Sequence, residues 1–155
     1  MYKFSPLTDD AAEEIAFQWK YDGEYSFYDM TADQEDLEEF LSPDRSGYYA
    51  VERNDELIGY FCFQRDEAGQ LEIGLGMKPK LTGKGLGLEF VLEGIRFAIA
   101  NYQTSALSLS VAAFNKRAIK VYEKTGFESI ETFKQDTNGS TYEFVRMNYE
   151  PKGEK

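Results

Sequence analysis

The sequence predicts an α/β (α+β) protein, in which a mixed, mostly antiparallel sheet carries helices on both faces, as a single domain over residues 1–155. Short apolar runs separated by turn residues fill 48–77 and alternate as strands do. The apolar residues between 88 and 99 instead recur every three to four positions, the period of an amphipathic helix. A chain of 155 residues can bury a single core, so no linker is expected.

A strand and two helices are predicted in the first forty residues. Residues 4–7 indicate the strand, after which Thr8 is placed to cap a helix over 9–19 with an acidic first turn. A second helix is predicted over 32–41, because Thr31 opens a capping-box pattern. The aromatic-rich segment between the two helices has no clear period, and we expect a loop there.

Hairpins and two further helices account for the rest of the chain. Strand patterns flank Asn54-Asp55, and a turn at 66–70 leads to a further strand at 71–77. The remaining predicted elements are a helix from Leu88, a strand over 107–111, a helix that follows Asn115, and strands over 128–134 and 141–149 around an Asn138-Gly139 turn.

Charge and missing residue types exclude several functions. Seventeen basic residues against 28 acidic ones give a net charge of −11, which disfavours nucleic acid and anionic membranes and favours cationic partners, unless it serves only solubility. The chain has no histidine, which excludes Ser-His and Cys-His catalysis and histidine metal sites, and no metal is expected. Cys62, the single cysteine, fits a small buried hydrophobe better than a nucleophile.

No apolar run reaches the length of a membrane span, and the N-terminus lacks the basic and hydrophobic regions of a secretory signal. The expected compartment is therefore the cytoplasm.

Residues 82–87 predict a phosphate-binding loop in front of the helix from Leu88. Gly83, Gly85 and Gly87 let the backbone approach an anion and adopt positive φ, and the helix N-terminus adds unpaired N–H groups. Lys84 adds a positive charge. A Walker A loop is excluded, because Gly85 stands where Ser or Thr is required, and a GxGxG run in mid-chain fits a dinucleotide fingerprint poorly.

This loop resembles the acyl-CoA loop of the GNAT superfamily of N-acetyltransferases, whose pattern is Arg or Gln, two residues, Gly, one residue, then Gly or Ala. Thr82, Gly85 and Gly87 occupy these positions, so Thr82 departs from the usual Arg or Gln. The segment NKRAIKVYEKTGF resembles the later motif of the superfamily at all five of its positions, which are Asn115, Ala118, Tyr122, Gly126 and Phe127. The resemblance implies one GNAT-like domain.

The resemblance further implies an N-acetyltransferase that moves an acetyl group from acetyl-CoA to a primary amine by direct attack. The residues it assigns to acetyl-CoA are Met77, Thr82, Gly83, Lys84, Gly85, Leu86, Gly87 and Asn115. Met77 would offer a strand-end backbone amide to the thioester carbonyl, and Asn115 would bind the pantetheine arm, cap a helix, or do both. Thr82 supports an alternative, a non-catalytic acyl-CoA-binding sensor or interaction module, and a nucleotide binder is a third possibility.

Two side chains are candidates for acid–base catalysis. The resemblance places Tyr122 near the thioester sulfur as general acid, and a phenol with a pKa near ~10 is protonated at neutral pH. Glu72 lies on the strand where some family members carry a catalytic glutamate, and strand alternation turns it away from Leu71 and Ile73. The alternatives are a Tyr122 that only packs in the core, a Glu72 that is only solvated, and a water chain that acts as the base.

The segment 19–29 falls where this fold covers the acceptor amine. Its aromatic residues are interleaved with acidic ones, a combination that suits an ammonium, and the residues are Trp19, Tyr21, Tyr25, Phe27 and Tyr28 with Asp22, Glu24 and Asp29. The expected acceptor is a small-molecule or peptide amine, polycationic amines included, and neither nucleic acid nor membrane is expected as a partner. Two alternatives stay open: rings that only pack the segment onto the domain, and a homodimer.

Overall fold

The computed structural model describes residues 2–21, 23–42, 46–67, 69–81, 85–102 and 106–150. The chain divides into two compact units. Unit 1 consists of Met1–Cys62, Leu75–Thr82 and Asp136–Ser140, and unit 2 consists of Phe63–Gly74, Gly83–Gln135 and Thr141–Lys155. Strands β3 (Glu56–Arg65) and β4 (Leu71–Met77) each contribute residues to both units.

Seven strands form one sheet in the order β1-β2-β3-β4-β5-β7-β6. Their bounds are β1 Tyr2–Pro6, β2 Tyr48–Arg53, β3 Glu56–Arg65, β4 Leu71–Met77, β5 Leu107–Ala112, β6 Phe127–Thr137 and β7 Ser140–Tyr149. β1 pairs with β2, β2 with β3, and β5 with β7 in antiparallel fashion, whereas β4 pairs with β5 in parallel. The predicted α/β class with a mixed, mostly antiparallel sheet is therefore confirmed.

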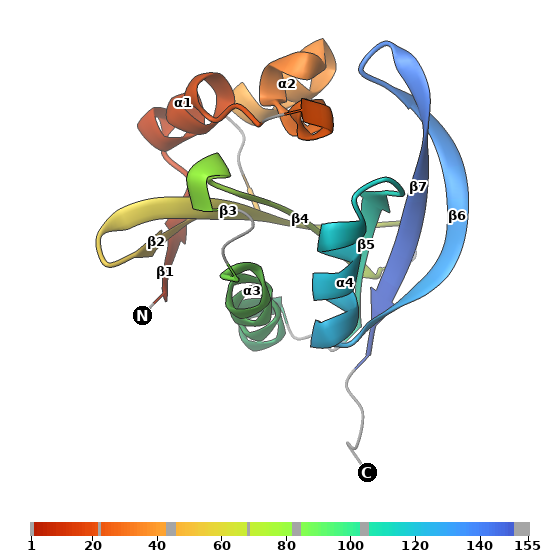
Figure 1. Ribbon diagram of the computed structural model, residues 1–155. Coiled ribbons are helices and arrows are strands. Elements are labelled where there is room, and N and C mark those ends of the chain that lie inside the picture. Colours follow the sequence, from red (N-terminus) through yellow and green to blue (C-terminus); the bar gives the residue numbers. More distant parts are fainter. Residues whose placement is uncertain are drawn as a thin grey trace. The chain divides into compact units, whose positions relative to one another are not determined.

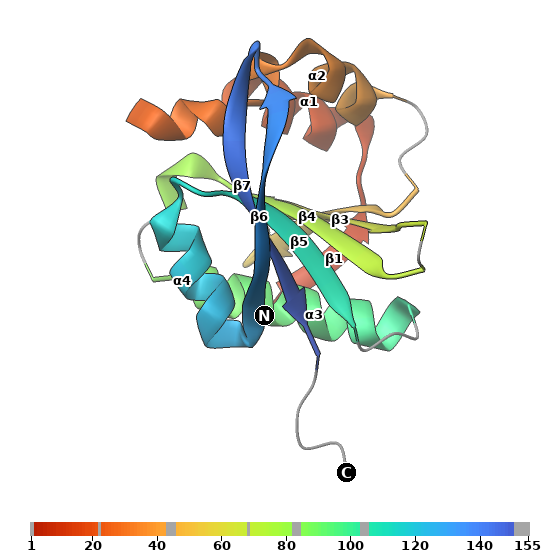
Figure 2. The same cartoon turned by 90° about the vertical axis from the view of Figure 1, so that its right-hand side faces the viewer.

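Helices α1 (Asp9–Gln18) and α2 (Gln34–Leu41) lie side by side in unit 1 (Figures 1 and 2). α1 begins where the sequence predicts, because the Thr8 hydroxyl accepts a hydrogen bond from the Ala11 N–H at 3.2 Å. Its inner face, Ala12, Ile15 and Ala16, joins Phe40 of α2 in one buried apolar cluster. Burial of this face anchors both helices on β2 and β3, since Ala50 belongs to the same cluster and Tyr60 packs against it.

The predicted capping box of α2 is wrong. Thr31 belongs to the short 3-10 helix η2 (Met30–Ala32), and its hydroxyl accepts a hydrogen bond from Lys20 Nζ at 2.7 Å instead of capping a helix. α2 therefore begins at Gln34, two residues later than predicted, and the Gln34 side chain bonds to Glu38 within the helix. The segment predicted as a loop contains a second 3-10 helix, η1 (Gly23–Tyr28).

In unit 2, helices α3 (Gly87–Tyr102) and α4 (Lys116–Thr125) lie side by side (Figures 1 and 2). Of the predicted apolar face of α3, Val91, Ile95 and Ala98 are buried, whereas its end members Leu88 and Ile99 are exposed. Phe90, which the predicted face did not include, is also buried. Phe97 stacks on Phe63 of β3 with 5.8 Å between ring centroids. This packing holds α3 against the sheet along its length and leaves its N-terminal turn to be shaped by the preceding residues.

Both ends of α4 are capped as the sequence predicts. Asn115 is the N-cap, and its Oδ1 accepts a hydrogen bond from the Ala118 N–H at 3.1 Å. Gly126 ends the helix in the left-handed region at φ 115°, and its N–H donates to the Glu123 carbonyl at 3.2 Å. The position of α4 along the chain is therefore set locally by its own caps.

The last two strands are longer than predicted. The turn between them is correct, with Asn138 and Gly139 at φ 52° and 79°, but β6 continues to Thr137 and forms a long curved ribbon with β7 (Figure 1). Most side chains of β6 are exposed, so this edge strand carries no alternating apolar pattern by which its length could be predicted. Backbone pairing rather than burial extends it.

The environment of Cys62 also differs from the expectation of a buried hydrophobe. Its neighbours Phe61 and Phe63 are buried, and Cys62, on the opposite face of β3, is half-buried beside the Tyr48 hydroxyl. Burial in the first place, and then the Cys62 thiol, raises the pKa of Tyr48 above its usual range.

Among the helices of the described residues, none combines the length and hydropathy that a membrane crossing requires.

The cap of α4 yields a stability prediction. We expect Asn115→Ala to lower the free energy of unfolding by about 1 kcal/mol, because the Ala118 N–H loses its acceptor, whereas Asn115→Ser, which can still cap, should lose only a few tenths. Urea denaturation of the three proteins measures both differences. Equal losses in the two variants would show that the side chain stabilises the helix by some means other than capping.

Candidate functional site

The described part of the predicted phosphate loop is an open backbone turn. Thr82, Gly83 and Lys84 lie outside the described residues. Gly85 has φ 80°, and among the described residues no atom comes within 4 Å of the place that a Cβ there would occupy. Gly87 is the first residue of α3, where a Cβ would lie 3.7 Å from Val121 of α4. The turn therefore has free space at Gly85 and contact with α4 at Gly87.

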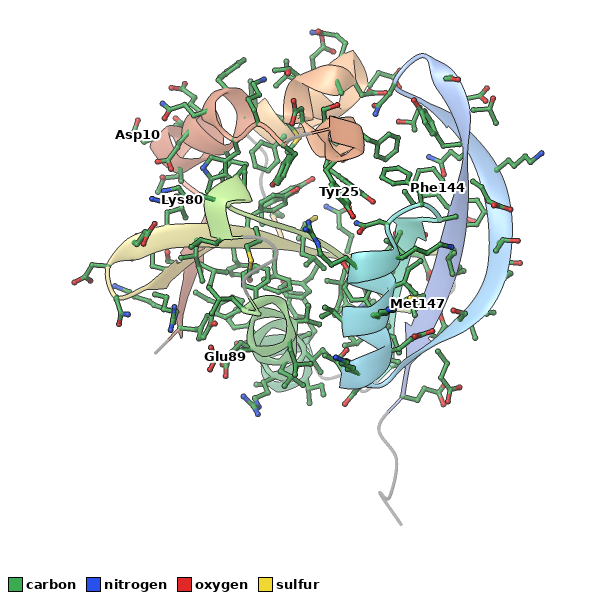
Figure 3. All side chains as sticks on the ribbon, viewed as in Figure 1. Asp10, Tyr25, Lys80, Glu89, Phe144 and Met147 are labelled. Carbon is green, nitrogen blue, oxygen red and sulfur yellow. The ribbon has the colours of Figure 1, made fainter. Side chains whose placement is uncertain are left out.

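The N-terminus of α3 presents backbone N–H groups next to this space. The Phe90 N–H donates to the Leu86 carbonyl at 3.0 Å, so the α-helical pattern of bonds begins there and the N–H groups of Gly87 and Leu88 have no acceptor within that pattern. Such groups, together with the positive end of a helix dipole, favour an anion. Glu89 in the first turn is exposed and points outward from α3 (Figure 3).

Helix α4 carries the second predicted motif. Ala118 and Tyr122 are four residues apart on one face, and Tyr122 is 9 % exposed with its ring centroid 5.9 Å from that of Phe127. Tyr122 is thus a core residue, as the packing alternative requires, and its proposed catalytic role is compatible with this position because a phenol can be packed at its ring. Asn115, at the other end of the helix, uses Oδ1 for the cap.

Four basic side chains project from α4, a feature that the sequence analysis did not single out. Each of them is exposed, and they are Lys116, Arg117, Lys120 and Lys124. α4 has one acidic residue, Glu123, so the helix is strongly positive in a chain with a net charge of −11. Its contact with Gly87 brings this charge next to the N-terminus of α3, where it adds to the attraction for an anion.

Glu72 lies in a row of polar residues across three strands. It is half-buried on β4 and pairs in register with Ser108 of β5, which in turn pairs with Asn148 of β7. Ser108 is fully buried, and within the described residues neither its Oγ nor the Asn148 Oδ1 has a hydrogen-bond partner. Buried polar atoms normally have a partner in protein, ordered water or ligand. The row is therefore suited to hold water or a polar ligand group beside Glu72.

Met77 lies at the end of β4 in unit 1, where Tyr21 contacts it. The Tyr21 hydroxyl donates a hydrogen bond of 2.7 Å to the Met77 carbonyl, and the Tyr21 N–H donates to Asp29 Oδ1 at 2.8 Å. Burial of Tyr21 is the main cause, and the charge of Asp29 a further cause, that raises the pKa of Tyr21 above its usual range. The phenol is therefore protonated at neutral pH. The sequence analysis assigned Tyr21 only to the aromatic segment.

The turn of the last hairpin holds the same segment from another direction. Asp33 Oδ2 accepts hydrogen bonds from the Asn138 N–H at 2.9 Å and from the Thr137 hydroxyl at 3.2 Å. The Asn138 side-chain amide donates to the Phe27 carbonyl at 3.0 Å. These partners are more than 100 residues apart in the sequence, and no local pattern could have identified them.

Trp19 does not belong with the predicted acceptor aromatics. It is 3 % exposed within the apolar cluster of α1 and α2, and its Nε1 donates to Glu14 Oε2 at 3.3 Å. The packing alternative is therefore correct for Trp19, whose apolar neighbours in that cluster leave no face for a ligand. Tyr25, Phe27 and Tyr28 are half-buried, whereas Asp22 and the side chain of Glu24 lie outside the described residues.

The sequence-predicted residues thus divide between the two units. Unit 2 contains Glu72, Asn115 and Tyr122 together with the described loop residues Gly85, Leu86 and Gly87. Unit 1 contains Met77 and the segment 20–33. Within unit 2, the contact of Gly87 with α4 joins the predicted phosphate-binding loop to the helix that carries Asn115 and Tyr122. In unit 1, Tyr21 joins the aromatic segment to Met77.

Comparison with known proteins gives relatives with acetyltransferase names. The chain is 36% identical over 92 residues to a mycothiol acetyltransferase of Streptomyces avermitilis, an alignment that covers 57% of this chain and 29% of that protein. It is 27% identical over 136 residues to acetyltransferase PseH of Campylobacter jejuni, covering 82% of this chain and 85% of that protein. The chain therefore spans less than a third of the mycothiol acetyltransferase and most of PseH.

Solved structures show the same fold. A structure of AAC(6')-Ib in complex with ribostamycin and coenzyme A superposes with a TM-score of 0.70 at 18% identity, covering 96% of this chain and 93% of that one. The family model described as "Acetyltransferase (GNAT) domain" matches residues 3–128, which is well over half of the chain. The two sequence motifs and the fold agree with that match, and the chain belongs to the GNAT family of acetyltransferases.

Proposed function

We propose that the protein is an acetyl-CoA-dependent N-acetyltransferase in which a primary amine attacks the thioester directly. The observation that carries the proposal is the open turn at Gly85, which precedes the N-terminal backbone N–H groups of α3 and contacts the basic helix α4 through Gly87. A pyrophosphate needs such a combination of free space, backbone donors and positive charge. The family supplies the expectation that this phosphate belongs to coenzyme A.

The residues present fit the donor in unit 2. Backbone N–H groups of the turn at 85–87 would bind the pyrophosphate, with Thr82, Gly83 and Lys84 completing the loop. Asn115 would bind the pantetheine arm through its side-chain amide group, since Oδ1 already caps α4. The basic residues of α4 would raise the local concentration of the anionic donor.

Acetyl transfer requires two proton movements. When the neutral amine attacks the thioester carbon, an N–C bond forms, the C–S bond breaks, and its electron pair goes to sulfur. We assign Tyr122 to protonate that sulfur, because its helix begins at Asn115 beside the proposed pantetheine site. We assign the removal of the amine proton to Glu72, through water held by Ser108 and Asn148, because the polar row of these three residues has unused hydrogen-bonding atoms.

For the acceptor, we propose an amine that carries a second positive charge. Tyr25, Phe27 and Tyr28 are half-buried in the segment of unit 1 whose neighbouring acid is Asp29, so rings and a carboxylate occur together there. A second ammonium could stay charged beside such groups while the reacting nitrogen is neutral. The name of one relative, mycothiol acetyltransferase, is compatible with a small-molecule acceptor.

A matched pair of amines tests the function and the acceptor class together. With acetyl-CoA, hexane-1,6-diamine should release free thiol about three to ten times faster than hexylamine, the advantage expected of one cation–π or ionic contact, and the advantage should shrink as salt is raised. Thiol release is measured at two ionic strengths. Equal rates with the diamine and hexylamine would contradict the proposed acceptor class and indicate that the acidic residues serve only solubility. No release with any amine by protein that binds coenzyme A would favour the non-catalytic sensor or interaction module.

Two glycines with the same backbone geometry test the phosphate site. Gly85 and Gly69 have φ 80° and 85°, and for both no described atom lies within 4 Å of a Cβ position. We expect Gly85→Ala to weaken coenzyme A binding about tenfold, the loss of one hydrogen bond to a charged group, while Gly69→Ala leaves it unchanged. Calorimetric titration measures both affinities, and unfolding curves should show similar backbone strain in the two variants. Equal coenzyme A affinities of the Gly85→Ala and Gly69→Ala variants would contradict a phosphate site at Gly85.

Two tyrosines that flank one phenylalanine test the general acid. The rings of Tyr122 and Tyr149 lie 5.9 and 5.4 Å from that of Phe127. Tyr122→Phe should lower kcat about 100-fold with little change in coenzyme A affinity, because it removes a proton donor and keeps the ring, whereas Tyr149→Phe should retain activity. Steady-state kinetics with the best amine of the panel give the comparison. A fully active Tyr122→Phe variant would assign Tyr122 to packing alone.

A further inference from the structure

Tyr21 connects the acceptor segment of unit 1 to the end of strand β4. Its hydroxyl donates to the Met77 carbonyl, 56 residues further along the chain, at 2.7 Å. Its backbone N–H is fixed at the same time by Asp29 Oδ1 at 2.8 Å. The neighbouring residue, Lys20, is tied to Thr31 by a hydrogen bond of 2.7 Å. The hydroxyl of Tyr21 is therefore held in place by a segment that is itself held at several points.

This hydrogen bond completes the fixation of one peptide group. In the peptide between Met77 and Lys78, the Lys78 N–H donates to the Ile58 carbonyl of β3 at 2.8 Å, and the C=O accepts from Tyr21. The N–H and C=O of a trans peptide lie in one plane and point in opposite directions. Rotation of this peptide plane would therefore break both hydrogen bonds, so its orientation is set from both sides.

The same residue carries the N–H that would meet the thioester. In an extended strand the N–H and C=O of one residue point to the same side, so the Met77 N–H points away from β3, to the side from which Tyr21 approaches. In the described residues, the pairing of β4 with β5 covers Leu71 and Glu72 and does not extend to Met77. Sheet pairing thus leaves this N–H for a ligand.

We propose that Tyr21 is a positioning residue for acetyl transfer. By holding the Met77 carbonyl, it restrains the backbone torsions of Met77 and, through them, the direction of the Met77 N–H, which belongs to the preceding peptide. The inference rests on the proposed function and on the role that the family resemblance implies for Met77, whose N–H would bind the thioester carbonyl. As the amine attacks, negative charge develops on the carbonyl oxygen. A donor that is already oriented stabilises this charge without a reorganisation of the backbone. Tyr21 itself touches no reacting atom.

Two unreactive analogues of acetyl-CoA isolate the contact with the carbonyl. One is the ketone in which a methylene replaces the thioester sulfur, and the other is S-ethyl-CoA, which has no carbonyl. The wild-type protein should bind the ketone about three to ten times more tightly, as expected of one hydrogen bond. Tyr21→Phe, which keeps the ring, should reduce this ratio towards one and leave the affinity for S-ethyl-CoA unchanged. Calorimetric titration measures all four affinities.

Tyr48→Phe is the matched control, because it removes another phenol with a raised pKa from the same unit at a place remote from Met77 in the chain. It should preserve the ratio. If Tyr21→Phe merely loosened the segment, that variant would bind both analogues more weakly and the ratio of their affinities would stay as in the wild-type protein. That result, or a wild-type ratio of one, would overturn the inference. Failure of the wild-type protein to bind either analogue would instead overturn the proposed function.

Kinetics add a second, independent comparison. Tyr21→Phe should lower kcat about tenfold, because the oriented N–H acts most strongly in the transition state, and should leave KM for acetyl-CoA and for the amine within about twofold. Melting temperatures confirm that the variants are folded. A rise in KM for the amine with an unchanged kcat would make Tyr21 an acceptor contact and contradict the positioning role.

Discussion

The buried face of α3 is the constraint on which the proposed donor site depends. Phe90, Val91 and Ile95 are held against the core, and each such side chain contributes about 1.5–3 kcal/mol when it is fully buried. Because this face anchors the helix, its N-terminal turn does not have to use its own N–H groups for stability. The helix end can therefore remain available to an anion without loss of the fold.

Unit 1 uses a different principle. The segment 20–33 is fixed by hydrogen bonds between side chains and backbone atoms, at Met77, Phe27 and Asn138. Such bonds are directional, and each is worth about 0.5–1.5 kcal/mol, so they set an orientation more than they add stability. A segment held in this way keeps partly exposed aromatic rings in defined positions, which is what recognition of an amine requires.

Charge is distributed unevenly over the chain. The net charge is −11, yet α4 carries four basic residues and one acidic residue. In the proposed reaction, acidic residues elsewhere would attract a cationic acceptor and the basic helix would attract the anionic donor, so the two substrates would be attracted by opposite charges. A uniformly acidic protein would repel coenzyme A.

Local signals in the sequence determined much of the fold and part of the site. Thr8, Asn115, Gly126 and the Asn138-Gly139 turn act on neighbours a few residues away, so their effects could be predicted from spacing alone. Tertiary structure decided what depends on distant partners. It placed Trp19 in the core, moved the start of α2 to Gln34, and joined Tyr21 to Met77. These outcomes depend on contacts between residues far apart in the chain, and such contacts leave no periodic pattern in a single sequence.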